Sequence, residues 1–503
     1  MAREQSAHPV EAIRNIMRFG SHSVAADTLR DVRNARASLR LLLLAAVASA
    51  AMGAAGYAFL AALRVVTAAR EDHLWLFALL PVVSVVTAWL YRNHGLRSKR
   101  GNNLVIDSTL TGTPIHARMA LLTFCCGTAT HLAGGSAGRE GAAVQIGGTI
   151  ASNVAALFHV TGHDRRDLMM AGISAAFGAA FGTPLAGAFF GMEMCFIGKL
   201  DYSAALYCLS GSFIGNAVSR ALGTPFPFQS IPVVPEMTPR VLTLVLLASV
   251  AFGLVARLFS LAIRTVKYVY ACFDNYLFAA AVGGLVVTVL ALGCGLTRFG
   301  GLSEWMPAAA FHGETGLADP FLKLGMTALT VGAGLQGGEV TPLFGIGSSL
   351  GAWIGTVTLG DPAFMAALGM LGVFGAALNV PITTVMLGID MFGGGASGYF
   401  VIVVFISYLV AGHRAVYPAQ RIVTPKRRSL SADESLTVDE AIERHHETVE
   451  HFDLEHREYG AEGHDEGACG GHGDFANPGS SADSSVGKPL PSRDAEPTAD
   501  RNR

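Results

Sequence analysis

The sequence predicts an all-α polytopic membrane protein built from tilted, broken and re-entrant helices. Of its 503 residues, 51% are hydrophobic and only 15% are charged, whereas soluble domains carry about 25% charged residues. Stretches of about 20 residues without Asp, Glu, Lys or Arg can span a bilayer as helices. Several such stretches occur, among them 41–63, 73–91, 168–192, 275–297 and 391–412. They lack the period-two alternation that a transmembrane β-barrel requires.

Composition divides the chain into a cytoplasmic N-terminal segment (1–37), a transmembrane domain (38–424) and a cytoplasmic tail (425–503). Basic residues are concentrated before the first apolar stretch and after the last one. The positive-inside rule therefore predicts that both termini are cytoplasmic. The first span, 38–63, then leaves the cytoplasm, and the second, 74–91, returns to the basic loop Arg92–Arg100.

The tail is rich in Gly, Ser, Asp, Glu, His and Pro, so we expect it to be mostly disordered, with a short helix at 437–457. Its clustered histidines are His445, His446, His451, His456, His464 and His472. A metal-binding tail and a solvated polar tail both fit this composition, and we favour the solvated tail. We expect no metal centre, no cofactor and no nucleic-acid partner.

An internal repeat covers most of the transmembrane domain. FGAAFGTPLAGAFFGMEM at 177–194 matches FGAALNVPITTVMLGIDM at 374–391, and Glu193 aligns with Asp390. A second pair of motifs, Gly138–Glu140 and Gly337–Glu339, recurs in the same order at nearly the same spacing. Transporters commonly consist of two such halves, with the binding site where their broken helices meet. The units are roughly 40–220 and 240–420, and their similarity leaves a parallel or an inverted arrangement open.

The first candidate site is the charged pair Arg139–Glu140 within the glycine-rich run GGSAGREGAAVQIGG. A charge at mid-membrane depth costs roughly 2.5–3.5 kcal/mol, so the pair needs a buried or aqueous setting. The N–H groups of Gly138 to Gly141 suit an anion at a helix N-terminus. Glu140 would occupy that place when charged and leave it when protonated, which couples anion and proton movement. The alternative is an ion pair that only closes a helix end.

Three further segments carry candidate anion ligands. In Gly337–Pro342, Pro342 suits a first helical turn, Val340 and Thr341 offer an N–H and a hydroxyl, and Glu339 is a second buried carboxylate. A glycine-rich helix contact is the alternative. Asn102 and Asn103 offer amide donors, or only a helix N-cap. Tyr417 offers a hydroxyl near the end of the last helix, or only an interfacial anchor.

Taken together, these residues resemble the CLC family of chloride channels and proton-coupled anion antiporters across about 100–420. Gly138–Ala142 is similar to the GREGP-type segment, Gly338–Pro342 to the GxFxP-type segment and Gly101–Val105 to the GSGIP-type segment, while Tyr417 matches the final tyrosine. The resemblance implies inverted repeats, a homodimer among membrane lipids, and one independent pathway in each subunit. It also implies that Glu140 is the gating, proton-accepting glutamate.

The departures from the common pattern resemble the fluoride-exporting branch of the family. The family's chloride-coordinating serine is Asn102 here, its proline after GREG is Ala142, and its inner proton-transfer glutamate falls on Met194. Glu339 and Thr341 within GGEVTP are the markers of that branch.

This resemblance implies a secondary active transporter that exports fluoride across the cell (inner) membrane in exchange for protons. The alternative is a chloride/proton antiporter or a passive anion channel. Extra donors at Asn102 and Thr341 suit fluoride, which is small and strongly hydrated. Because Met194 stands in place of that glutamate, the inner proton route has no assigned residue in the resemblance. We expect Glu339 to contribute to this route.

Two other functional classes account for the sequence less well. Gly134–Gly138 matches G-x-S-x-G, which would make Ser136 the nucleophile of an intramembrane hydrolase. Its surroundings are transmembrane rather than strand–turn–helix, and His131 offers no evident geometry, so we do not expect an enzyme. A non-transporting scaffold would leave carboxylates beside glycine turns unexplained.

Overall fold

The computed structural model describes residues 8–95, 100–226, 229–426 and 433–444, and most of them are helical. Within this part of the chain, six helices are long and apolar enough to cross a membrane: Ala35–Asp72, Leu74–Asn93, Pro239–Ala271, Tyr276–Gly293, Val340–Thr358 and Gly394–Ala411. Four of them coincide with predicted charge-free stretches. The prediction of one span at 168–192 is wrong, because the chain breaks there into two helices.

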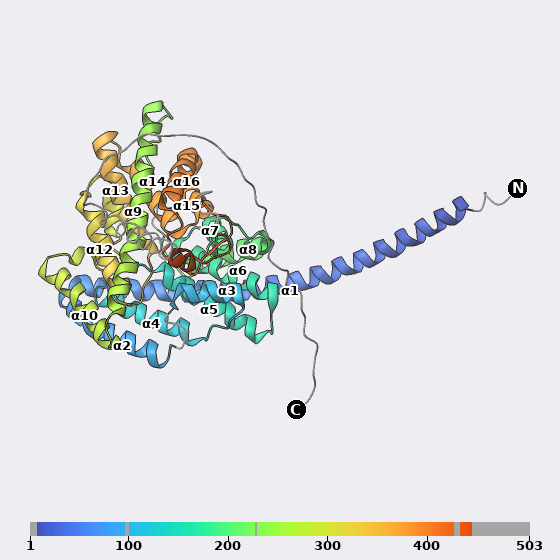
Figure 1. The fold of residues 1–503 in the computed structure, drawn as a ribbon, viewed down its shortest axis with the longest axis horizontal. Helices are drawn as coiled ribbons and strands as arrows, with labels where there is room; N and C mark the ends of the chain where they lie inside the picture. The colour runs from blue at the N-terminus through green and yellow to red at the C-terminus, as the bar shows by residue number, and fades with distance from the viewer. Residues whose placement is uncertain (1–7, 96–99, 227–228, 427–432, 445–503) are drawn as a thin grey trace, which may run out of the picture. The chain divides into compact units, whose positions relative to one another are not determined.

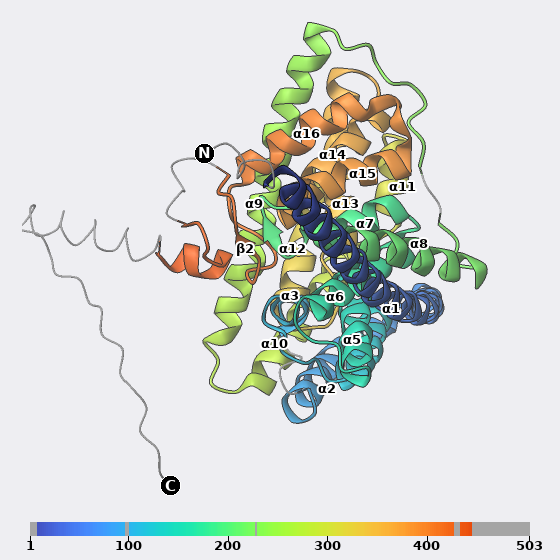
Figure 2. The same cartoon turned by 90° about the vertical axis from the view of Figure 1, so that its right-hand side faces the viewer.

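Helices of the first half gather together, coloured blue to green in Figures 1 and 2. They are α1 (His8–Asp72), α2 (Leu80–Asn93), α3 (Asn102–Thr111), α4 (Arg118–Leu132), α5 (Glu140–Leu157), α6 (Gly162–Phe181), α7 (Pro184–Glu193) and α8 (Ala205–Ala221). Short 3-10 turns lie at η1 (Leu74–Leu79) and η3 (Tyr202–Ala204).

Helices of the second half follow, in yellow-green to orange. They are α9 (Pro239–Ala271), α10 (Tyr276–Thr288), α11 (Trp305–Phe311), α12 (Ala318–Gly332), α13 (Val340–Thr358), α14 (Pro362–Leu378), α15 (Pro381–Phe392) and α16 (Ser397–Ala411). Short turns lie at η4 (Val289–Gly293), η5 (Thr297–Phe299) and η6 (Gly394–Ala396). A two-residue parallel pair joins β1 (Phe196–Ile197) to β2 (Arg421–Ile422).

The sequence repeat corresponds to two matching helix pairs, α6–α7 and α14–α15. Gly182 and Asn379 occupy equivalent C-cap positions, and both have a left-handed backbone, with φ of 74° and 60°. Asparagine tolerates this conformation better than most residues that carry a Cβ atom. Pro184 and Pro381 then begin the following helices, where a missing N–H does no harm. Local chemistry thus breaks both repeats at the same place.

Reciprocal capping shows that the two repeats are inverted. Near the end of α7, the Glu193 carboxylate accepts hydrogen bonds from the N–H groups of Ile382 and Thr383 at the start of α15 (3.1 and 2.8 Å). Near the end of α15, the Asp390 carboxylate accepts from Leu185 and Ala186 at the start of α7 (both 3.0 Å). Each helix therefore ends beside the other's beginning, and each carboxylate complements a positive helix pole.

Removing the Glu193 cap should destabilise the fold. In Glu193→Ala, the Ile382 and Thr383 N–H groups and the Thr383 hydroxyl lose their buried acceptor. We expect a cost of about 2–4 kcal/mol, because unsatisfied buried donors are expensive. Thermal unfolding in detergent would show a lower Tm, while the exposed acid Glu236→Ala serves as the control. Equal Tm values for the two variants would contradict this account.

The described part of the predicted tail packs against the transmembrane domain. The Ile422 N–H donates to Leu436 (2.8 Å), and the Val438 N–H donates to Gln420 (3.0 Å). Val438 and Ala441 are buried against Tyr408 and Ile422. Apolar burial and backbone pairing thus hold residues 433–444 on the domain, while the tail boundary at 425 stays a prediction. Helix covers 438–444 of the predicted 437–457, and the remainder, with the six tail histidines, lies outside the described residues.

Candidate functional site

Two helix N-termini meet at one backbone bridge. The Gly138 N–H donates to the Gly338 carbonyl (2.5 Å) and the Gly338 N–H donates to the Gly138 carbonyl (2.6 Å), in an antiparallel arrangement. Helix α5 begins two residues after Gly138, and α13 begins two residues after Gly338. A Cβ on Gly141 would lie 2.8 Å from the Gly338 Cα, so this approach requires glycine.

Glu140 is the first residue of α5, and its side chain is only 1% exposed. Its carboxylate accepts hydrogen bonds from the Thr341 hydroxyl (2.5 and 2.6 Å) and from the Thr341 N–H (3.1 Å). Arg139 supplies its backbone N–H (3.1 Å) and its side-chain Nε (3.2 Å). The carboxylate therefore occupies donors at the N-terminus of α13, a position that favours negative charge.

A second chain of hydrogen bonds connects α3 to the start of α13. The Asn102 side-chain amide donates to the Tyr417 hydroxyl (3.1 Å), which donates to the Glu339 carboxylate (3.3 Å). All three side chains are buried. The side-chain oxygen of Asn102, Oδ1, has no hydrogen-bond partner among the described residues. Asn103 accepts from the Ala419 N–H (3.1 Å), which fixes the loop that carries Tyr417.

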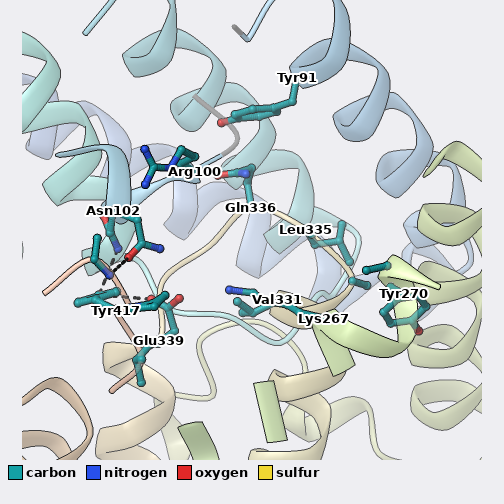
Figure 3. A pocket seen from close by; sticks show the side chains of 18 of the residues that line it. Tyr91, Arg100, Asn102, Lys267, Tyr270, Val331, Leu335, Gln336, Glu339 and Tyr417 are labelled. Carbon is teal, nitrogen blue, oxygen red and sulfur yellow. Dashed lines mark hydrogen bonds between the residues drawn. The ribbon is translucent and has the colours of Figure 1, made fainter. Parts of the chain in front are cut away.

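Asn102, Asn103, Glu339 and Tyr417 line a cavity of 680 Å³ (Figure 3). Its other polar lining includes Arg100, Gln145, Lys267 and Gln336. The cavity extends to Thr437, Asp439, Glu440 and Glu443 of the C-terminal segment. We call it the Asn102 cavity.

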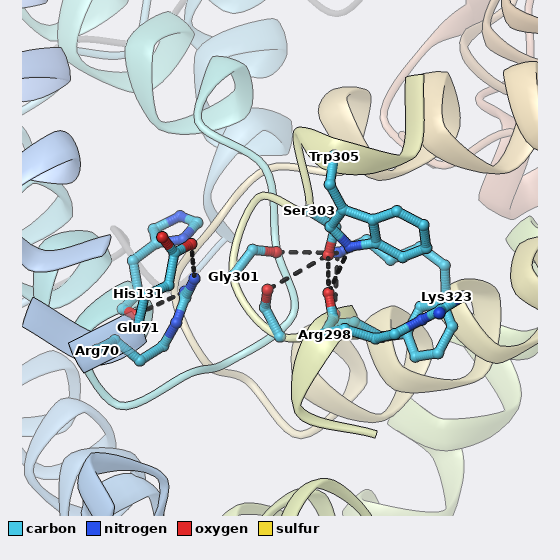
Figure 4. Close-up of polar contacts among 10 residues, drawn as sticks. Arg70, Glu71, His131, Arg298, Gly301, Ser303, Trp305 and Lys323 are labelled. Atoms are coloured by element: carbon cyan, nitrogen blue, oxygen red, sulfur yellow. Dashed lines mark hydrogen bonds and ion pairs between the residues drawn. The ribbon is translucent and has the colours of Figure 1, made fainter. Parts of the chain in front are cut away.

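Arg139 lines a different cavity, of 530 Å³. Its guanidinium pairs with the Glu304 carboxylate (2.6 Å) as well as with Glu140. Arg70, Arg298 and Trp305 share this lining, and Figure 4 shows their polar contacts. Glu140 lines neither cavity. The predicted ligands are thus split between two cavities, with the buried Glu140 carboxylate linked to the second one through Arg139.

Several predictions need correction. Gly138 does not offer its N–H to an anion, because the Gly338 carbonyl accepts it. The guanidinium of Arg139, a predicted anion ligand, is held by the carboxylates of Glu140 and Glu304. Asn102 is not an N-cap: Gly101, with φ of 56°, precedes the helix, and the Asn102 side chain donates to Tyr417 instead. Tyr417 follows α16 and is only 2% exposed, so it is not an interfacial anchor.

Gly141 and Val340 remain candidate donors, as predicted. They stand in the first turns of α5 and α13, where N–H groups have no acceptor within the helix. Both are buried beside the Gly138–Gly338 bridge. Their geometry is compatible with an anion ligand.

A buried cation that the sequence did not predict lies near this bridge. Lys323 is 0% exposed, and its Nζ donates to Ser136, Ser303 and the carbonyls of Phe299 and Gly301 (2.9–3.1 Å). A lone lysine in the apolar run FLKLGMTALTVGAG was the available signal.

The chain matches known proteins over most of its length. Residues 83–412 match the family model described as voltage gated chloride channel. The chain belongs to this CLC family. A chloride/fluoride channel protein of Pseudomonas syringae pv. tomato is 34% identical over 390 residues, which cover 76% of this chain and 86% of that protein. The H(+)/Cl(-) exchange transporter ClcA of Cronobacter sakazakii is 29% identical, over 70% and 82% of the two chains.

Solved CLC structures share the fold. A crystal structure of a CLC-type fluoride/proton antiporter superposes with a TM-score of 0.74 at 33% identity, covering 76% of this chain and 98% of that one. A slow cyanobacterial Cl-/H+ antiporter gives a TM-score of 0.64 at 20% identity, which concerns the fold alone. This CLC protein is therefore a multi-pass membrane protein of a family of transporters and channels.

Proposed function

We propose that this CLC protein is a secondary active transporter that exports fluoride in exchange for protons. One observation carries the proposal: the Glu140 carboxylate occupies the Thr341 amide and hydroxyl that fluoride would need. Those donors can hold one anion at a time. Binding of fluoride there requires Glu140 to leave, and protonation removes the charge that holds it there. The solved and curated relatives include fluoride-handling proteins, and this supports fluoride as the anion.

Each site residue then has a role in the proposed cycle. Fluoride approaches through the Asn102 cavity, where Asn102, Asn103 and the Tyr417 hydroxyl replace its water, and then reaches the N–H groups of Gly141 and Val340 at the two helix N-termini. Glu339 borders the same cavity and accepts a hydrogen bond from Tyr417, so it is placed to exchange a proton with water that enters the cavity. Glu140 carries the proton and gates the path, while Arg139 orients its carboxylate.

Three further assignments belong to the proposal. The protein lies in the cell (inner) membrane with both termini in the cytoplasm, because basic residues concentrate at the two ends of the transmembrane domain. It acts as a homodimer with one pathway in each subunit, as the family resemblance implies. Residues 1–37 form the cytoplasmic N-terminal segment, and the transmembrane domain begins at about residue 38.

Ion flux from reconstituted liposomes tests the function. Vesicles loaded with fluoride should release it and take up protons at the same time, measured with a fluoride electrode and an external pH electrode. Chloride-loaded vesicles should release chloride far more slowly. Equal chloride and fluoride rates would favour the chloride/proton alternative, and fluoride release without proton uptake would favour a passive channel.

A further inference from the structure

The charges that line the Asn102 cavity are unexpected for the pathway of an anion. Among the described residues, five carboxylates line it, opposed by two cations, Arg100 and Lys267. The carboxylates are Asp107, Glu339, Asp439, Glu440 and Glu443. An anion that enters this cavity meets mostly charges of its own sign, which disfavours its occupancy.

Most of these charges already have partners. Arg100 forms an ion pair with Asp107 (2.5 Å), so the two charges offset each other. Asp439 pairs with Arg264 (2.5 Å). Glu440 accepts from the Thr437 N–H (2.7 Å) and hydroxyl (2.9 Å), and these bonds lower the pKa of Glu440, which keeps it charged. The C-terminal segment therefore makes the rim of the cavity acidic.

Lys267 is the other cation among the described lining residues. It lies near the C-terminal end of α9, and within the described residues no carboxylate lies within 4.0 Å of its ammonium. Lys267 and Glu339 both line the cavity, in whose wall Figure 3 shows them. A lysine ammonium is a compact point charge with three donors and a flexible stem, which suits transient capture of a small anion.

We propose that Lys267 is the fluoride-recruiting residue of the Asn102 cavity. Its ammonium offsets the acidic rim, draws fluoride in from the cytoplasmic side and brings it towards Asn102 and Tyr417. This assignment rests on the proposed fluoride export and adds a residue that sets the apparent affinity for the anion. No covalent step is involved.

Lys267→Met tests the proposal in reconstituted liposomes. We expect KM for fluoride at the cavity side to rise by about tenfold, because a unit charge is lost beside the anion path. The maximal rate should change much less, since the donors around Thr341 and Asn102 are untouched. Lys267→Arg keeps the charge and should restore a KM close to that of the unmodified protein.

Arg257→Met is the matched control. Arg257 lies on the same helix, ten residues before Lys267, and does not line the cavity. Its substitution therefore removes an equal charge at a point about 15 Å along the helix from Lys267. Raising the ionic strength with an impermeant salt should reduce the difference between Lys267→Met and the unmodified protein, because salt screens charges in water. A purely structural role would not respond to salt in this way.

The outcomes separate the two proposals. An unchanged KM in Lys267→Met, or an equal rise in Arg257→Met, overturns the role of Lys267 and leaves fluoride export standing. A lower maximal rate without a change in KM also overturns it. If the unmodified protein exports no fluoride, the proposed function fails and this assignment fails with it. Isothermal titration calorimetry of purified Lys267→Met with sodium fluoride gives a second measurement of fluoride affinity, one that does not depend on transport.

Discussion

Glu140→Gln is expected to abolish proton transport. Glutamine keeps the size of the side chain but cannot carry the charge that competes with fluoride or the proton that is exchanged. Its neutral carbonyl oxygen would bind the Thr341 donors less strongly than a carboxylate does, because hydrogen bonds to charged groups are roughly twice as strong. Fluoride-loaded liposomes should then show proton uptake at the level of protein-free vesicles.

Controls for this experiment come from the same structure. Glu304→Gln removes the exposed partner of Arg139 but leaves Glu140 and Thr341 in place, so it should retain coupled transport. Size-exclusion chromatography would establish that both variants are folded. Undiminished proton-coupled pumping by Glu140→Gln would rule out the role given to this residue.

Gly338→Ala should have the second large effect, because it separates the two helix N-termini. A Cβ at this position would lie 2.5 Å from the Gly141 nitrogen, and backbone atoms cannot move aside as a flexible side chain can. Overpacking of this kind costs about 1–3 kcal/mol and shifts the backbone. The bridge to Gly138 would be lost, and the Thr341 donors would move away from Glu140. We therefore expect fluoride transport to fall to background while the helical fold persists.

Gly325→Ala provides the comparison. Gly325 lies within α12, and a Cβ there would meet no atom within 4 Å. Alanine is also the better helix former, so stability should be unchanged or slightly increased. Transport by Gly338→Ala at the rate of Gly325→Ala would show that close approach of the two backbones is not required.

The positions of helices and the identity of the motifs could be read from the sequence. Long charge-free stretches predict spans because hydrocarbon admits few charges, and Pro184 and Pro381 mark helix starts because of their own backbone geometry. The glycine motifs at Glu140 and Glu339 were found in the same way. These properties are local, so one segment is sufficient to reveal them.

The partners of these groups could not be read in this way. Glu193 and Asp390 align in the repeat, yet each caps the other's helix across about 200 residues of sequence. Gly138 gives its N–H to Gly338, Asn102 reaches Tyr417 more than 300 residues away, and Lys267 enters a cavity that the C-terminal segment makes acidic. Such contacts depend on how distant helices pack, because a donor or a charge has no intrinsic preference for one acceptor until folding places one beside it.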